Sequence, residues 1–297
     1  MDRAGGALLT AAVAAVLQRR RDRRFRRQPS RRVRGPRSAL AFVDDVGFCS
    51  TFYCLPEGVP CLWEAVVGRA RPRWPRRSHH DHGVGLTWEL KDTLPAARRV
   101  YYGKLVKGRP VLVALDLFPA FYALVRGRQR ARDYGAEYAA GRLGHTAKHL
   151  MDALMRERPQ YTRELRANTF LLSPSRTRDF ERAMAELQRG LWVVKTEERY
   201  EPSFSYRWDL VEAWLPEATA EGRRLPRGTA LERIVTRYLA AAVFTRIELL
   251  ARLLGVARAE LVPVLGRLER AGVLCAGCEV EGWPGRWLVD RAALREL

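Results

Sequence analysis

The stretches FERAMAEL (residues 180–187) and LVPVLGRL (residues 261–268) decide how this chain folds. In both, apolar residues fall at positions i, i+3, i+4 and i+7, and the second stretch begins 81 residues after the first. That spacing places the apolar residues on one side of an α-helix. The residues that share it are Phe180, Ala183, Met184 and Leu187, then Leu261, Val264, Leu265 and Leu268. The chain is therefore predicted to contain two similar helices, each buried along one side.

The elements around these two helices repeat as well. A short helix precedes each, beginning at Thr162 or Thr245, whose hydroxyl can accept a backbone hydrogen bond. A longer amphipathic helix comes before each short one, and a β-rich run follows each buried helix. Three helices followed by a two-stranded wing are the winged-helix form of the helix-turn-helix motif. The predicted fold class is α+β, with tandem winged-helix units at residues 143–212 and 229–291.

The first part of the chain shows no such recurrence. Residues 1–37 are predicted to be a disordered basic arm, because their clustered arginines repel one another and leave little to bury. Residues 38–132 are predicted to be a helical and β-hairpin region. Its elements are a helix at 39–46 that ends at Gly47, a helix at 62–67, a helical turn from Thr87, and strands at 100–106 and 111–114.

Composition indicates an anionic partner. The chain of 297 residues has 53 basic and 33 acidic side chains, a formal net charge of +20. Only five of the basic residues are lysines, and so strong an arginine excess partly indicates a GC-rich genome. Residues 1–37 carry twelve arginines and two acidic residues, a net charge of +10 and thus half of the total. The remaining +10 favours nucleic acid. Together with the repeated order of elements, it favours double-stranded DNA over the protein partners that many three-helix bundles bind.

The sequence also indicates the cellular compartment of the protein. No apolar run is long enough for a membrane span, and the apolar residues 7–17 precede the arginines, the reverse of a secretory signal. Five cysteines without a disulfide framework are typical of a reducing compartment. We expect a cytoplasmic, nucleoid-associated monomer.

Seven basic side chains are the candidate DNA contacts. With its apolar stripe buried, the helix near residue 180 exposes several arginines, whose planar guanidinium groups can bind a phosphate or the edge of guanine. The helix near residue 265 is less basic, so its unit is predicted to be structural. The candidates are Lys91, Lys104, Arg163, Arg176, Arg178, Arg182 and Lys195.

The patterns for metal and cofactor sites are weak. His79, His80 and His82 are too close together to bind one tetrahedral ion easily, and Cys275 and Cys278 lack a second cysteine pair. No phosphate-binding loop or dinucleotide fingerprint occurs. No metal or cofactor is therefore expected. The remaining candidates for acid or base chemistry are Asp44, Asp45 and Asp92, although surface carboxylates are commoner.

Five stretches of the sequence resemble the AlkZ-related branch of the bacterial crosslink-repair DNA glycosylases. The resemblance spans roughly residues 38–290 and implies tandem winged helices that form a basic cradle for duplex DNA. It also implies excision of alkylated or crosslinked purine bases by N-glycosidic cleavage, without a metal. The stretches are residues 42–49 (FVDDVGFC), 88–95 (WELKDTLP), 100–105 (VYYGKL), 180–195 and 204–210 (FSYRWDL).

One position departs from the family pattern. The active enzymes carry Gln-x-Gln or Gln-x-Asp after a Gly-apolar pair, whereas here Gly47-Phe48-Cys49 is followed by Ser50-Thr51-Phe52. Ser50 is thus at the position of the family glutamine and Phe52 at that of its partner. The sequence therefore predicts a DNA-binding protein of the glycosylase type. The alternative is a DNA-binding regulator or lesion sensor without catalysis.

Overall fold

The computed structural model describes residues 8–53, 55 and 58–295. Within these residues, helices alternate with three small sheets, which confirms the predicted mixture of helix and strand. No helix of the described part is long and apolar enough to cross a membrane. One order of elements occurs three times: a helix, a short strand, two helices and a β-hairpin. We call residues 36–114, 145–210 and 227–290 the first, second and third units.

The first unit shows this order in full, although the sequence predicted only a helical and hairpin region there. Its three strands pair antiparallel in the order β2-β4-β3, with Phe48 opposite Val113 and Tyr102 opposite Leu112. Its elements are α2 (Pro36–Val46), β2 (Phe48–Ser50), α3 (Leu62–Val67), α4 (His82–Ala96), β3 (Val100–Val106) and β4 (Arg109–Ala114).

The second and third units have matching sheets. Their strand orders are β5-β7-β6 and β9-β10-β8, so the short strand always lies beside the last strand of the hairpin. The second unit consists of α7 (His145–Arg156), β5 (Gln160–Tyr161), α8 (Thr162–Ala167), α9 (Thr177–Arg189), β6 (Val193–Arg199) and β7 (Ser205–Leu210). The third consists of α12 (Arg227–Ala242), β8 (Phe244–Thr245), α13 (Ile247–Leu254), α14 (Arg258–Arg270), β9 (Leu274–Val280) and β10 (Trp283–Asp290). Both predicted apolar stripes are buried, on α9 and α14.

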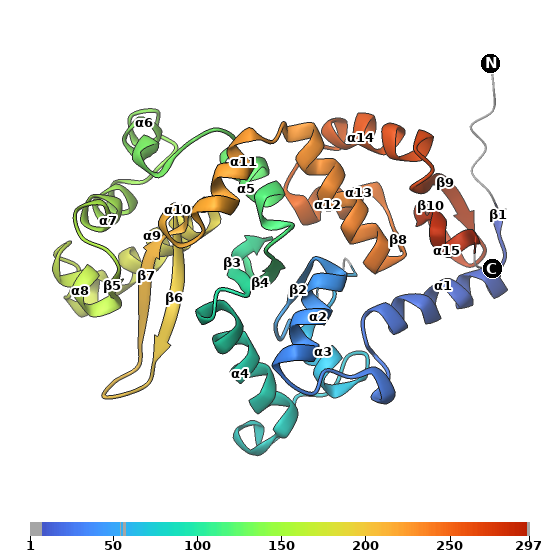
Figure 1. Cartoon of the computed structure of the whole chain (residues 1–297), viewed down its shortest axis with the longest axis horizontal. Helices are drawn as coiled ribbons and strands as arrows, with labels where there is room; N and C mark the ends of the chain where they lie inside the picture. The colour runs from blue at the N-terminus through green and yellow to red at the C-terminus, as the bar shows by residue number, and fades with distance from the viewer. Residues whose placement is uncertain (1–7, 54, 56–57, 296–297) are drawn as a thin grey trace.

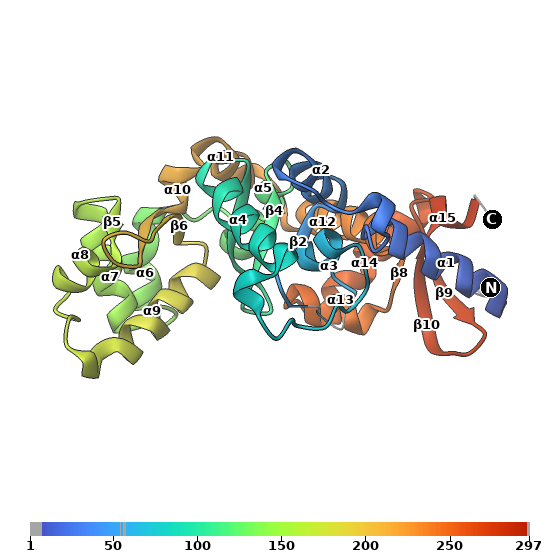
Figure 2. The same ribbon diagram turned by 90° about the horizontal axis from the view of Figure 1, so that it is seen from below.

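The units lie in a row, with the first between the second and the third (Figures 1 and 2). The first and third share one hydrophobic core, in which Phe48 stacks on Tyr238, while the second has its own. Helix α5, which follows the first unit, packs against α11 and against α12 of the third unit. The helices between the units are α5 (Phe118–Arg126), α6 (Tyr134–Ala139), α10 (Val211–Trp214) and α11 (Pro216–Arg224), and α15 (Arg291–Arg295) follows the third unit. Single 3₁₀ turns occur at Pro29–Arg31, Ser78–His80, Ala131–Asp133 and Pro174–Arg176.

The prediction of a disordered arm is wrong for residues 8–37; residues 1–7 lie outside the described residues. Strand β1 (Leu8–Leu9) adds to β9, and α1 (Ala11–Arg24) packs on the third unit. Leu17 is fully buried. Arg21 donates a hydrogen bond of 2.6 Å to the Ala242 carbonyl and lies 3.4 Å above the Phe244 ring. The arginines do not keep this segment unfolded, because such partners offset their repulsion.

The turn after α2 requires a glycine, as predicted. Gly47 has φ +78°, a left-handed conformation that other residues rarely adopt. A Cβ there would collide with the side chain of Arg237 and approach Leu117 to 2.8 Å. The chain therefore turns directly from α2 into β2, which leads to the site described next.

Candidate functional site

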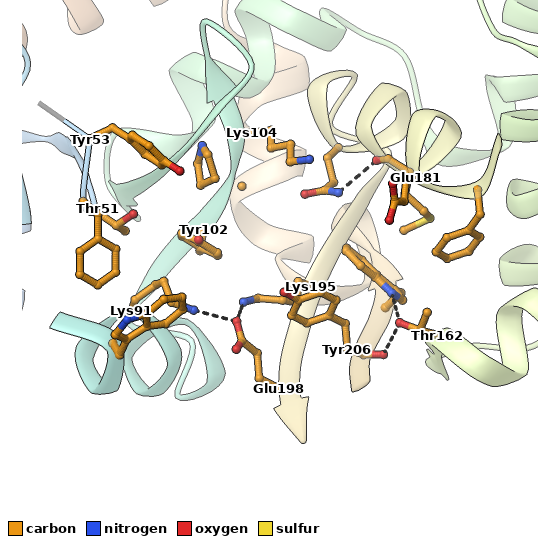
Figure 3. Close-up of a pocket in the computed structure, with 18 of the residues that line it drawn as sticks. Thr51, Tyr53, Lys91, Tyr102, Lys104, Thr162, Glu181, Lys195, Glu198 and Tyr206 are labelled. Atoms are coloured by element: carbon orange, nitrogen blue, oxygen red, sulfur yellow. Dashed lines mark hydrogen bonds and ion pairs between the residues drawn. The ribbon is translucent and has the colours of Figure 1, made fainter. Parts of the chain in front are cut away.

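A cavity of about 930 Å³ lies between the first and second units. The contacts that frame it are reciprocal: α4 of the first unit touches β6 of the second, and α9 of the second touches β3 of the first. Figure 3 shows its side chains converging from both units. The residues that line it are Thr51, Phe52, Tyr53, Trp74, Trp88, Lys91, Tyr102, Gly103, Lys104, Pro110, Thr162, Arg166, Thr177, Phe180, Glu181, Met184, Gln188, Lys195, Glu198, Tyr206 and Trp208.

Aromatic rings form much of the cavity wall. On the side of the first unit, the Phe52 ring lies 5.1 Å from Trp88 and 5.8 Å from Trp74, and both tryptophans are about half exposed. On the side of the second unit, the Tyr206 ring lies 5.6 Å from Trp208. The indole nitrogen of Trp208 donates a hydrogen bond of 3.0 Å to the Thr162 hydroxyl, which fixes this ring against α8. The half-exposed rings of Trp74 and Trp88 are of the kind that binds flat aromatic ligands by stacking.

A buried cluster of charges joins the two units beside these rings (Figure 3). The ammonium of Lys91 from α4 donates a 2.8 Å hydrogen bond to the Glu198 carboxylate, which comes from β6. Lys195 contacts the same carboxylate oxygen and lies 3.9 Å from the Asp92 carboxylate. The Lys91 and Glu198 side chains are only 4% and 3% exposed. Tyr200 donates to the other Asp92 oxygen at 2.8 Å. The first and second units are thus held together by ion pairs that water hardly reaches.

The surroundings of Lys195 disfavour its charged form. Burial, and then the neighbouring ammonium of Lys91, lower the pKa of Lys195 to about 7, against a partly compensating attraction to Asp92. Its nitrogen lies 4.7 Å from the centre of the Tyr102 ring and 5.0 Å from that of Tyr206. Burial also raises the pKa of both tyrosines, so they stay neutral. Lys195 is therefore an amine whose proton is readily lost near neutral pH.

Comparison with protein families assigns the chain. The model of the family described as "AlkZ related" matches residues 33–255, which is most of the sequence. The chain belongs to the AlkZ-related family. This confirms the resemblance found in the sequence, and the match spans the first and second units and the cavity between them.

The fold is also that of a solved member of the AlkZ group. The structure titled "Streptomyces sahachiroi DNA glycosylase AlkZ" aligns with a TM-score of 0.55 and 14% sequence identity. The alignment covers 93% of this chain and 71% of that one. At this identity the likeness shows the fold alone. No curated protein matches the sequence significantly.

None of the four predicted catalytic residues lines the cavity of this AlkZ-related chain, although Ser50 directly precedes the lining residue Thr51. Asp44 and Asp45 are exposed on α2; Asp45 pairs with Arg26 at 3.1 Å. Burial and the nearby Asp116 raise the pKa of Asp44. Ser50 is fully buried, and its hydroxyl donates to the Pro60 carbonyl at 3.2 Å. Of the four, only Asp92 reaches the cavity region, through its contacts with Lys91 and Lys195.

The predicted DNA contacts separate into two groups. Lys91, Lys104 and Lys195 line the cavity instead of an outer surface. The other four are exposed arginines of the second unit. Arg178 and Arg182 are on α9, Arg163 is on α8, and Arg176 pairs with Asp179 at 3.1 Å. This second group lies on an exposed surface, and its contact with DNA stays a prediction.

The sequence interpretation missed Glu198 and the aromatic wall. Both hairpin strands of the second unit were assigned to the wing, and Glu198 is one of several charged residues there. The sequence nevertheless contains a signal for the aromatic wall: residues 204, 206 and 208 are all aromatic. Alternate residues of a strand lie on the same side of it, so these three rings are expected to line one face. Neighbouring rings along this series are 4.9 Å and 5.6 Å apart.

The histidine and cysteine patterns form no metal site in the described part of the chain, where no three potential ligands converge. The rings of His145 and His149 contact each other, with their Nε2 atoms 3.1 Å apart. The thiols of Cys275 and Cys278 are likewise 3.1 Å apart, and burial raises the pKa of Cys278 to about 12.

Proposed function

We propose that this chain is a DNA-repair protein of the glycosylase type, which binds damaged double-stranded DNA and holds one unstacked base in the cavity. The observation that carries this proposal is the aromatic cavity between α4 and α9, the third helices of two similar units. Each unit has the element order of a winged helix, in which the third helix contacts the DNA groove. A duplex that contacts both helices would place its bases beside the cavity.

The dimensions and charge of the site support a base as its ligand. Proteins that act on a base within a duplex rotate it out of the stack into a pocket with aromatic walls. A volume of about 930 Å³ lies at the upper end of the usual range for ligand pockets and leaves room for a nucleotide. Exposed arginines lie on α8 and α9, the helices that also contribute residues to the cavity lining, and they can bind phosphates. Membership of the AlkZ-related family supports the same assignment.

Two candidate outcomes follow base binding. Excision is favoured by the family and by Asp92 and Glu198 beside the cavity. Recognition without excision is favoured by the position of the family glutamine, because Ser50 is buried and Phe52 belongs to the aromatic wall. Incubation with an alkylated duplex followed by hot alkali separates them. Strand breaks at the lesion would show excision, and intact strands would leave recognition alone.

Trp88 provides the test of base binding. Replacing it by alanine should weaken binding of a duplex with one bulged adenine about 5- to 160-fold, because stacking on an aromatic ring contributes about 1–3 kcal/mol per base. Binding of the fully paired duplex should change little. Fluorescence anisotropy measures both, with Tyr138→Ala on the distant helix α6 as control, since Tyr138 is also exposed. Equal losses for Trp88→Ala and Tyr138→Ala would contradict the proposal.

The exposed arginines of α9 provide the test of duplex binding. Arg178→Ala combined with Arg182→Ala should weaken binding and flatten its salt dependence by about 2 in the slope of log K against log salt, since each phosphate contact contributes about 0.9. Arg258→Ala with Arg270→Ala removes the same charge from α14 of the third unit and should leave the slope nearly unchanged. If the α14 pair had the larger effect, the contact surface would lie on the third unit.

A further inference from the structure

We propose that Lys195 forms a covalent imine with the deoxyribose of an abasic site and thereby cleaves the DNA strand there. This inference rests on the proposed binding of a duplex nucleotide in the cavity, and it does not require that the chain excise bases. It assigns to the cavity a lyase activity on abasic DNA, in addition to recognition.

The placement of lysines first points to amine chemistry. Arginine provides nearly all positive charge in this chain, with only five lysines among 53 basic residues. Three of these five line the cavity between the first and second units: Lys91, Lys104 and Lys195. Arginine binds phosphate at least as well as lysine does, but a guanidinium stays protonated and cannot attack a carbonyl. The lining of the cavity therefore holds three primary amines and one guanidinium group, that of Arg166, although lysine is rare in the chain as a whole.

Lys195 has the surroundings of a nucleophilic amine. The charged groups that face it are Lys91 and Asp92 from α4 and Glu198 from its own strand, and the neutral rings are Tyr102 from β3 and Tyr206 from β7. A desolvated lysine beside a second cation loses its proton easily and then attacks carbonyl carbon. Burial and the neighbouring Lys91 lower the pKa of Lys195 to about 7, so a large part of the amine is neutral at physiological pH.

The reaction balances without an oxidant or a reductant. The neutral amine of Lys195 adds to C1′ of the ring-opened abasic sugar, the aldehyde oxygen leaves as water, and a proton from solvent gives a protonated imine. A carboxylate then removes a proton from C2′, and the electron pair breaks the bond between C3′ and the phosphate oxygen. The phosphate leaves as the 5′ end of the downstream strand. Asp92, 3.9 Å from the Lys195 nitrogen, is placed to accept that proton. Water finally hydrolyses the imine and restores the amine.

Borohydride trapping tests the imine directly. The probe is a labelled duplex with one abasic deoxyribose, made by enzymatic removal of a uracil, so no base excision by this chain is needed. Incubation with sodium borohydride should produce a stable protein–DNA adduct on a denaturing gel. Mass spectrometry of the digested adduct should find the sugar on Lys195. An adduct on another residue, or no adduct although the duplex binds, would overturn the proposal.

Matched variants separate chemistry from folding and from binding. Lys195→Arg can still pair with Glu198, but its guanidinium cannot form an imine. Its adduct should therefore fall to background even at protein concentrations that saturate the abasic duplex. Lys148→Met is the control, because Lys148 is on α7 and pairs with Asp152 at 2.8 Å, outside the cavity. An adduct retained by Lys195→Arg would contradict the assignment. If the unchanged protein did not bind the abasic duplex at all, the proposed function would be contradicted instead.

The pH dependence gives an independent readout. Because only the neutral amine attacks, adduct formation should rise about tenfold per pH unit below pH 7 and level off above it. Lys91→Met removes the cation that helps to lower this pKa and should move the midpoint to higher pH. A rate that rises steadily to about pH 10, where an ordinary lysine titrates, would show that Lys195 is not the reacting amine.

Discussion

Replacing Glu198 by alanine should lower the free energy of unfolding by about 3–5 kcal/mol, the usual cost of leaving a buried charge without its partner. The Glu198 carboxylate accepts from Lys91 at 2.8 Å and contacts Lys195, and both Lys91 and Glu198 are almost completely buried. Without it, two ammonium groups would face each other with only Asp92 to offset them. Urea unfolding followed by circular dichroism measures the loss.

Glu197→Ala is the matched control for this experiment. Glu197 is the adjacent residue of β6, is 40% exposed and pairs with Arg207 at 3.5 Å, so its loss should cost less than about 1 kcal/mol. The effect of Glu198→Ala should also depend on pH. Lys195 carries its proton below its pKa of about 7, so the loss should be larger at about pH 6 than at about pH 9. Equal losses for the two variants would show that the cluster is not buried.

Leu17→Ala should lower the free energy of unfolding by about 2–5 kcal/mol, the range for emptying a closed apolar site. Leu17 is fully buried between α1 and the third unit, in a cluster with Phe244 and Val289. A disordered arm would make this substitution neutral. Thermal or urea unfolding of the variant distinguishes a packed N-terminal segment from a disordered one.

Leu8→Ala serves as the control for the N-terminal segment. Leu8 has the same side chain in the same segment but is 75% exposed, so its truncation should leave the stability nearly unchanged. If Leu17→Ala were as neutral as Leu8→Ala, residues 8–37 would not be packed as described.

Sequence periodicity predicted the second and third units because their buried stripes are uninterrupted. In α9 and α14 every position of the stripe is apolar, so the 3.6-residue period is clear. The first unit was not recognised as a third copy because α4 buries two polar residues, Thr87 and Lys91, on the same side as Leu90 and Leu94. A buried lysine breaks the pattern that marks a helix, and here it does so because it belongs to the site.

The N-terminal segment was mispredicted for a related reason. Clustered arginines indicate disorder only when they lack partners, and the partners here are far away in sequence: Arg21 meets Phe244, and Arg27 pairs with Glu64 at 2.7 Å. The cavity could not be predicted at all from local patterns. It forms between units whose facing residues, such as Trp88 and Tyr206, are more than a hundred positions apart.

The most direct test of base binding in the cavity is photocrosslinking. A duplex with one bulged 5-iodouracil is bound to the protein, irradiated and digested, and the modified peptides are identified by mass spectrometry. The account predicts attachment within α4, β3 or β7, at aromatic residues of the wall such as Trp88, Tyr102 or Tyr206. Attachment confined to α1 or α14, outside the cavity, would contradict it.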